Sequence, residues 1–265
     1  MKHNETTTRR TVLGSIVTGA LGAVSGCLGS PDSEDIFADV FVDGTELVVD
    51  LEKPAVDQVD LLTPSGRRFA DQSLSGDTDQ VTIEIGTEYE PGEHEVVAIE
   101  DGDELGRKPV TIEPDVRITE LRLGRNHPDE MFDGASDREI RTEVILEVRN
   151  KGTGPDKALR LEFDGDIPRR TPSKDEFPES GIYDVDSDIG GHAEFVKLPA
   201  DESVTLYSQR RPFSSHSERI SCEPETQQGQ LEVSVDTAVQ DGSVSELYNI
   251  SYTGENLIQC DIEVD

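Results

Sequence analysis

Short runs in which apolar and polar residues alternate recur along most of the chain from residue 36 onward. In residues 81–85, for example, Val81, Ile83 and Ile85 alternate with polar residues, so an extended segment there has one apolar face. Turn-forming residues such as Asp43 and Gly44 separate the runs at intervals of about eight to twelve residues. No apolar stripe with helical spacing continues over about ten residues. The pattern predicts an all-β protein made of short antiparallel strands.

The runs fall into two groups on either side of Pro114. In the first group we expect strands over residues 36–42, 45–51, 56–62, 80–85, 93–99 and 108–113. In the second group the clearest runs lie within 143–168, 196–207, 230–239, 245–252 and 257–264. This number of short strands suggests one β-sandwich over 36–114 and another over 115–265, with a long insertion at 168–193.

Two stretches resemble known modules. Residues 89–102, YEPGEHEVVAIEDG, resemble the penultimate-strand region of bacterial and archaeal immunoglobulin-like modules. Residues 143–168, together with VKLPADESVTLY at 196–207, resemble the CARDB-like modules related to cell adhesion, although those modules have a short loop where this chain has its insertion. The resemblance implies that the antiparallel sandwiches are immunoglobulin-like. It implies little about function, because such folds serve many roles.

The chain opens with a polar leader, the adjacent residues Arg9 and Arg10, and a weakly apolar run over 11–28. This order is typical of an export signal, and the paired arginines indicate the twin-arginine type. Four glycines interrupt the apolar run, which makes it a poor permanent membrane helix. We therefore expect a cleaved signal peptide over 1–26; a membrane-spanning anchor is the alternative.

The sequence AVSGC at residues 23–27 resembles the lipobox of exported lipoproteins, with Val24 where Leu is usual. The resemblance implies cleavage before Cys27 and a lipid on its thiol. A lipid with two chains holds a protein stably at a membrane. We therefore expect a tether over 27–35 and a folded remainder on the extracellular face of the membrane. Cleavage without lipidation, which releases the protein, is the alternative.

Acidic residues dominate the composition, with 57 Asp and Glu against 24 Lys and Arg and a net charge of -33. They are spread over nearly every loop and strand, which resembles the proteins of halophilic archaea. At about 4 M salt the screening length falls to roughly 1.5 Å, so this charge does not predict a basic partner. A basic stripe that would neutralise phosphates is missing from the sequence, and we expect no nucleic-acid partner.

Two cysteines remain after the lipobox, Cys222 and Cys260. An even pair in an exported chain predicts a disulfide, and two unpaired thiols are the alternative. The bridge would close a loop of about 38 residues and fix the last predicted strand.

Candidate catalytic chemistry is sparse. A Gly-x-Ser-x-Gly motif is absent, and the histidines have no metal-ligand spacing. We therefore expect no enzyme and no cofactor, with one exception. Asp184, Asp186 and Asp188 have the alternating spacing of a calcium loop, although the later positions of that motif do not match; an ordinary acidic surface loop is the alternative. Asn249 lies in a glycosylation sequon.

The insertion combines Arg169 and Arg170 with the aromatic residues Phe177 and Tyr183, and a second arginine pair follows at 210–211. Loops of this length are usually functional or disordered, and cations beside aromatics are typical of a contact patch. We expect a non-catalytic binding or adhesion module with an unknown protein or envelope partner. A passive structural component of the envelope is the alternative, and a secreted enzyme is the third reading.

Overall fold

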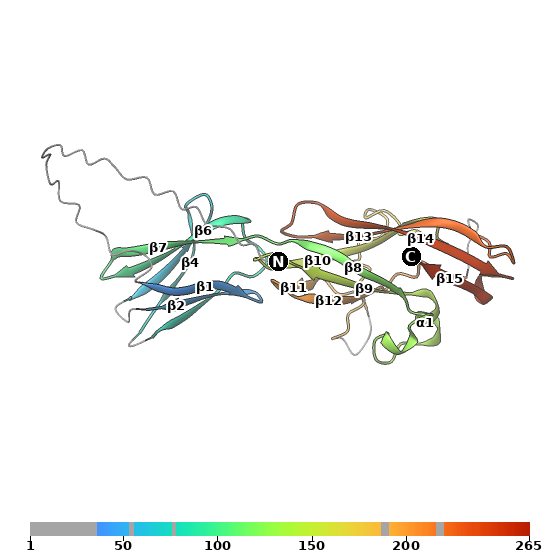
Figure 1. Ribbon diagram of the computed structural model, residues 1–265, viewed down its shortest axis with the longest axis horizontal. Coiled ribbons are helices and arrows are strands. Elements are labelled where there is room, and N and C mark those ends of the chain that lie inside the picture. The colour runs from blue at the N-terminus through green and yellow to red at the C-terminus, as the bar shows by residue number, and fades with distance from the viewer. Residues whose placement is uncertain (1–35, 53–55, 76–77, 187–190, 216–219) are drawn as a thin grey trace, which may run out of the picture. The chain divides into compact units, whose positions relative to one another are not determined.

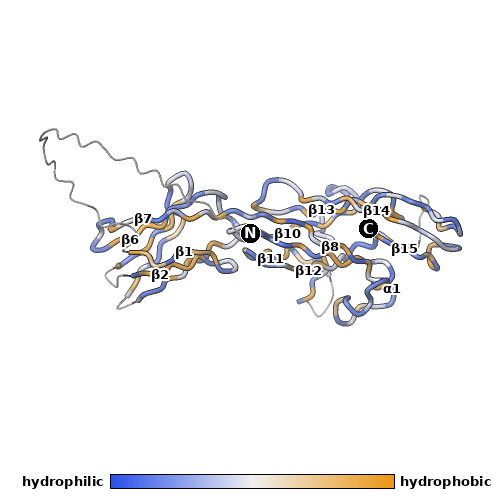
Figure 2. Tube along the Cα trace, in the orientation of Figure 1, coloured by the Kyte–Doolittle hydropathy of each residue, from blue (hydrophilic) through white to orange (hydrophobic). Residues whose placement is uncertain are grey.

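The computed structural model describes residues 36–52, 56–75, 78–186, 191–215 and 220–265. The predicted signal peptide and tether, with Arg9, Arg10 and Cys27, lie outside these residues and stay predictions. The regular structure of the described chain is almost entirely antiparallel β-sheet, which confirms the predicted all-β class (Figure 1). Hydrophobic and hydrophilic residues are interleaved along the strands (Figure 2).

The first group of strands forms a three-stranded sheet of order β1-β2-β5 and a four-stranded sheet of order β4-β3-β6-β7. Their bounds are β1 Phe37–Asp43, β2 Glu46–Leu51, β3 Gln58–Leu62, β4 Arg68–Ser73, β5 Gln80–Glu84, β6 Gly92–Glu100 and β7 Asp103–Ile112. The alternating residues Val81, Ile83 and Ile85 join one buried apolar cluster, as their spacing predicts. Strand β4 was not predicted, because it is an edge strand whose residues are mostly exposed and show no alternation.

The second group forms a three-stranded sheet of order β12-β9-β8 and a five-stranded sheet of order β11-β10-β13-β14-β15. Their bounds are β8 Val116–Leu123, β9 Val144–Asn150, β10 Asp156–Gly165, β11 Val196–Leu198, β12 Ser203–Tyr207, β13 Gln227–Thr237, β14 Ser243–Gly254 and β15 Cys260–Val264. The predicted domain boundary therefore falls in the short link between β7 and β8.

Helices are few and short in the described chain. They are α1 Asp137–Thr142 and the 3-10 turns η2 Pro128–Glu130 and η3 Leu257–Gln259. Ser136 and Glu139 form a capping box at the start of α1, so its first amide groups are satisfied although the helix is only six residues long. None of the helices among these residues is long and apolar enough to cross a bilayer.

The insertion completes one edge of β10. Strand β11 has only three residues and pairs with residues 156–158, so it leaves the rest of that edge open. Insertion residues fill the gap: Leu161 N donates to Ser180 O at 2.8 Å, Thr171 N donates to Phe163 O at 2.8 Å, and Phe163 N donates to Thr171 Oγ1 at 2.8 Å. Ile182 adds an apolar side chain to the core. Since buried backbone groups need partners, the described part of the insertion belongs to the fold.

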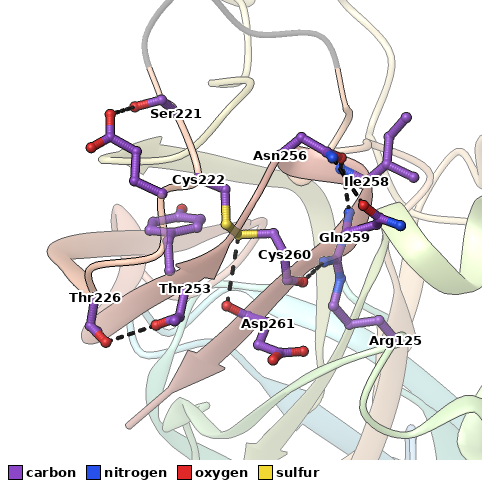
Figure 3. Close-up of a disulfide and its surroundings, with 12 residues drawn as sticks. Arg125, Ser221, Cys222, Thr226, Thr253, Asn256, Ile258, Gln259, Cys260 and Asp261 are labelled. Carbon is purple, nitrogen blue, oxygen red and sulfur yellow. Dashed lines mark hydrogen bonds between the residues drawn. A yellow bond between two sulfur atoms is a disulfide. The ribbon is translucent and has the colours of Figure 1, made fainter.

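Cys222 and Cys260 form a disulfide with a Cα–Cα distance of 5.9 Å, which confirms the predicted pairing (Figure 3). Cys260 is the first residue of β15, the last strand of the five-stranded sheet. The bridge spans 38 positions of sequence and therefore fixes this terminal strand to the segment before β13.

Replacing both Cys222 and Cys260 by Ser is expected to lower the free energy of unfolding by roughly 3 to 4 kcal/mol, because the unfolded chain regains the freedom of the open loop. The measurement is denaturant unfolding followed by circular dichroism. A reductant serves as the control: it should lower the stability of the parent to that of the variant and leave the variant unchanged. A parent that is insensitive to the reductant would contradict this role.

Candidate functional site

The two arginine pairs singled out in the sequence converge in the second sandwich. Arg169 and Arg170 come from the insertion, and Arg210 and Arg211 follow β12. Arg169 N donates to Pro212 O at 3.0 Å, which holds the two segments together. They border a pocket of about 210 Å³, called here the arginine pocket. It is lined by Arg169, Arg170, Thr171, Pro172, Phe177, His192, Gln209, Arg210 and Arg211.

The buried side chain of Arg160, in β10, binds the backbone of the insertion. Its side chain is 2% exposed, and its guanidinium Nη1 donates to Phe177 O at 2.6 Å and to Glu179 O at 3.1 Å. Nη2 donates to Pro172 O at 3.0 Å, and Nε pairs with Glu162. One buried cation thus binds three carbonyl groups of the insertion. These bonds fix the backbone on which Phe177 and the neighbouring pocket residues are carried.

Arg210 lies against the aromatic wall of the pocket. Its guanidinium carbon is 4.3 Å from the centre of the Phe177 ring, and its Nη2 donates to Glu179 O at 2.7 Å. The other side of Arg210 packs on Gly181. A Cβ at position 181 would lie 2.7 Å from Arg210 Nε, and the φ of +74° there also favours glycine. The position of Arg210 is therefore set by an aromatic face, a carbonyl group and a glycine.

Neutral donors complete the lining. Nδ1 of His192 lies 3.2 Å from the amide nitrogen of Gly181 and accepts its hydrogen, so the proton of the neutral ring is on Nε2. Burial, and then the charge of Arg210, lower the pKa of His192 below its ordinary value of 6.5. Thr171 Oγ1 accepts from Phe163 N, which leaves its hydroxyl hydrogen free to donate. Histidine and threonine therefore add hydrogen-bond donors to those of the arginines.

The charge of this pocket is opposite to that of the chain. Acidic residues are 57 of 265, yet none of the described ones lines the pocket. Arg170 pairs with Asp164 at 2.9 Å and Arg211 with Glu143 at 3.4 Å, but Arg169 and Arg210 have no carboxylate partner among the described residues. Burial, and then the charge of Arg160, lower the pKa of Arg210. A bound anion would offset this crowding of positive charge.

The size of the pocket limits what it can hold. Pockets that enclose a whole small molecule usually measure about 300–1,000 Å³, which is more than the arginine pocket offers. Guanidinium groups bind carboxylate, sulfate and phosphate through paired hydrogen bonds. The geometry therefore suits one anionic group that projects from a larger ligand.

The other sequence-predicted residues lie elsewhere. Tyr183 stacks on Phe132 with ring centres 3.8 Å apart and does not line the arginine pocket. Asp186 N donates to Asp184 Oδ1 at 3.1 Å, while Asp188 lies outside the described residues. No group of three or more potential metal ligands occurs among the residues that are described. The calcium loop stays a prediction. So does glycosylation of Asn249, which is exposed on β14.

Three contributors to the site were missed in the sequence. Arg160 gives no local signal, because a charged residue between leucines in a strand is expected to point to solvent, and here the insertion covers it. His192 and Thr171 belong to the insertion but had no motif. The roles of these three residues are seen only in the folded structure, where their side chains lie close to the arginine pairs.

Beside the pocket lies a buried carboxyl group, that of Glu143. It is 2% exposed, and its Oε1 accepts from Arg211 Nε at 3.4 Å. Its Oε2 has no hydrogen-bond partner among the described residues. Burial, and then the charge of Glu139, raise the pKa of Glu143 to about 7, although Arg211 acts in the opposite direction.

This raised pKa predicts a pH dependence of stability. Between pH 4.5 and 7 the folded state keeps a proton that the unfolded state releases, so the free energy of unfolding falls as the pH rises through this range, by up to about 3 kcal/mol. Glu143→Gln should remove this part of the slope, so that the variant gains stability over the parent at pH 8. Denaturant midpoints at pH 5 and pH 8 measure the difference. Glu202→Gln, at an exposed position, is the control; equal slopes in the parent and Glu143→Gln would rule the explanation out.

Comparisons with known proteins leave the family open. No protein family matches the sequence, and no curated protein is significantly similar to it. Among solved structures, a segment of two fibronectin type-III domains from chicken tenascin is similar at 9% identity, with 80% of this chain and 98% of that chain covered and a TM-score of 0.29. The IG1+IG2 segment of DIP-gamma is 15% identical, with 80% and 93% covered and a TM-score of 0.23.

A glycosyl hydrolase family 2 member from Bacteroides cellulosilyticus is 16% identical, with 82% of this chain covered and a TM-score of 0.22. This chain spans only 25% of the length of that enzyme. Similarities at these scores carry no argument about function.

Proposed function

We propose that this protein is an exported, lipid-anchored binding protein of a halophilic cell surface, and that it holds an anionic group of an envelope ligand in the arginine pocket without catalysis. The observation that carries the proposal is the composition of the pocket. Among the described residues, four arginines and no carboxylate line it, in a chain with a net charge of -33. Such a local excess of cations in an acidic protein favours a negatively charged ligand.

The lining also supports binding without chemistry. General acid–base catalysis needs a group that can exchange a proton near the working pH, placed against the reacting atoms. Here Nδ1 of His192 already accepts a backbone hydrogen bond, and within the described part of the chain the hydroxyl of Thr171 contacts the amide of Phe163 and no base. The pocket offers donors that hold an anion, and we assign it no catalytic role.

The proposed location of the protein rests on the residues that precede β1 in the sequence. Arg9 and Arg10 precede an apolar run that ends at Cys27, and polar residues separate Cys27 from β1. A lipid at Cys27 would leave the sandwiches free to meet a ligand in the envelope. The disulfide between Cys222 and Cys260 agrees with an oxidising exterior.

Removing one guanidinium from the pocket is expected to weaken binding of a small anion about tenfold, because a charged hydrogen bond is lost. The variants are Arg169→Gln and Arg210→Gln, and the probes are galacturonate and inorganic sulfate, titrated by calorimetry. The titrations use the lowest salt at which circular dichroism shows a folded protein. Arg169 has an exposed side chain, so its variant keeps the test valid if Arg210→Gln fails to fold.

The matched control is Arg67→Gln, which removes an exposed arginine from the other sandwich. It should bind both probes as the parent does. The absence of binding to the parent, or an equal loss in the control, would refute the anion site.

Replacing Cys27 by Ser is expected to move the protein from the membrane fraction into the medium or to leave its precursor uncleaved, since the lipid can no longer be attached. Cell fractionation with mass spectrometry of the N-terminal peptide measures both outcomes. The parent peptide should begin at a lipid-modified Cys27. An unmodified parent that retains Met1 in the cytosol would contradict export.

A further inference from the structure

A second arginine-lined pocket lies beside the first. It measures about 350 Å³ and includes Arg125, Arg138, Arg141, Phe213 and Ile258 in its lining. As in the arginine pocket, none of the described residues in the lining is acidic. A neighbouring hollow on the same sandwich shows the contrast, since Glu162, Asp164 and Glu232 all line it. Among the described residues, acidic side chains are thus absent from the lining of two pockets but present in the lining of a third pocket on the same sandwich.

The arginines of the second pocket differ in whether their guanidinium groups bind other parts of the protein. Arg125 is engaged in the fold: its Nε donates to Arg141 O at 3.1 Å, and its Nη1 donates to Cys260 O at 2.9 Å, beside the disulfide (Figure 3). Arg138 and Arg141 are exposed on α1. Neither has a carboxylate partner within the described part of the chain. Two guanidinium groups are therefore available to a ligand, and Arg125 fixes the backbone that carries one of them.

The two pockets share a thin wall. Arg211 lines the first pocket and Phe213 lines the second, two residues further along. Opposite this segment, at the C-terminal end of α1, Phe213 N donates to Thr142 O at 3.3 Å, and Arg211 contacts the adjacent Glu143. Two residues of extended chain cover at most about 7 Å, so the backbone of one lining residue of the first pocket lies within that distance of the backbone of one lining residue of the second.

We infer that the two pockets together bind one segment of an acidic polysaccharide, with one anionic group in each. This inference rests on the proposed function and names its ligand class. Linking two anionic groups makes the second contact intramolecular, so the polymer binds more tightly than the single group. Ile258, which is 70% exposed at the second pocket, offers an apolar surface for the carbon face of a sugar ring.

The aromatic residues disfavour a nucleic acid as the polymer. Single strands bind proteins largely by stacking their bases on open aromatic rings. Phe177 is 38% exposed, but Arg210 lies over its ring and His192 lies at its edge, while Phe213 is only 2% exposed. The guanidinium of Arg210 therefore competes with a base for the ring of Phe177, and Phe213 is too buried for a base to stack on it.

The test measures affinity against ligand length. Galacturonate monomer, dimer and hexamer are titrated into the purified protein. A sulfated dextran oligomer of matched length is titrated as well, and it shows whether the pockets prefer sulfate or carboxylate. The hexamer should bind at least about tenfold more tightly than the monomer. Arg138→Gln combined with Arg141→Gln should reduce the affinity for the hexamer to that of a monomer bound in the arginine pocket alone.

Arg169→Gln should weaken both ligands, which separates the two pockets. Arg67→Gln combined with Arg68→Gln removes an exposed pair from the other sandwich and should change neither. Equal affinity for monomer and hexamer would overturn the bridging and leave the single anion site standing. A single-stranded oligonucleotide that binds more tightly than the hexamer would overturn the ligand class, whereas failure of every anion would refute the anion site itself.

Discussion

The buried guanidinium of Arg160 is the constraint on which the site depends. A cation removed from water loses several kcal/mol of solvation unless hydrogen bonds and an opposite charge replace it. Glu162 supplies the charge, and the carbonyls of Pro172, Phe177 and Glu179 supply acceptors. Because those carbonyls belong to the insertion, the insertion cannot leave β10 without exposing this deficit. A segment that looks like a surface loop in the sequence is thereby tied to the central sheet.

High salt changes which forces hold a ligand. The general negative charge of the chain acts over a few ångströms at most when salt is concentrated, so it neither repels nor attracts a ligand from afar. Direct hydrogen bonds from guanidinium groups act at contact and are less affected. Under the proposed function, the composition of the pocket lining, and not the net charge, decides which ligand is bound. Chloride would then be the natural competitor.

Much of the fold could be read from the sequence, and the site only in part. Alternation identified strands such as β5 and β6, and the cysteine pair was correctly matched. Strand β4 escaped because four of its six residues are exposed and its apolar residues do not alternate with polar ones. The two arginine pairs and Phe177 were selected as a contact patch, and the structure brings them together. Tyr183 was grouped with them wrongly, since it packs on Phe132, and Arg160 escaped because its burial depends on a distant segment.

The pairing of β10 with a strand that follows much later in the sequence also affects how fast the chain folds. Strand β10 lies between β11 and β13, and Leu161 pairs with Val235, about 70 residues later in the sequence. The insertion supplies about a third of that separation. Closing so long a loop costs chain entropy before the contacts between its ends form to offset it, which slows folding. The loop that shapes the pocket therefore also delays the assembly of the sandwich that carries it.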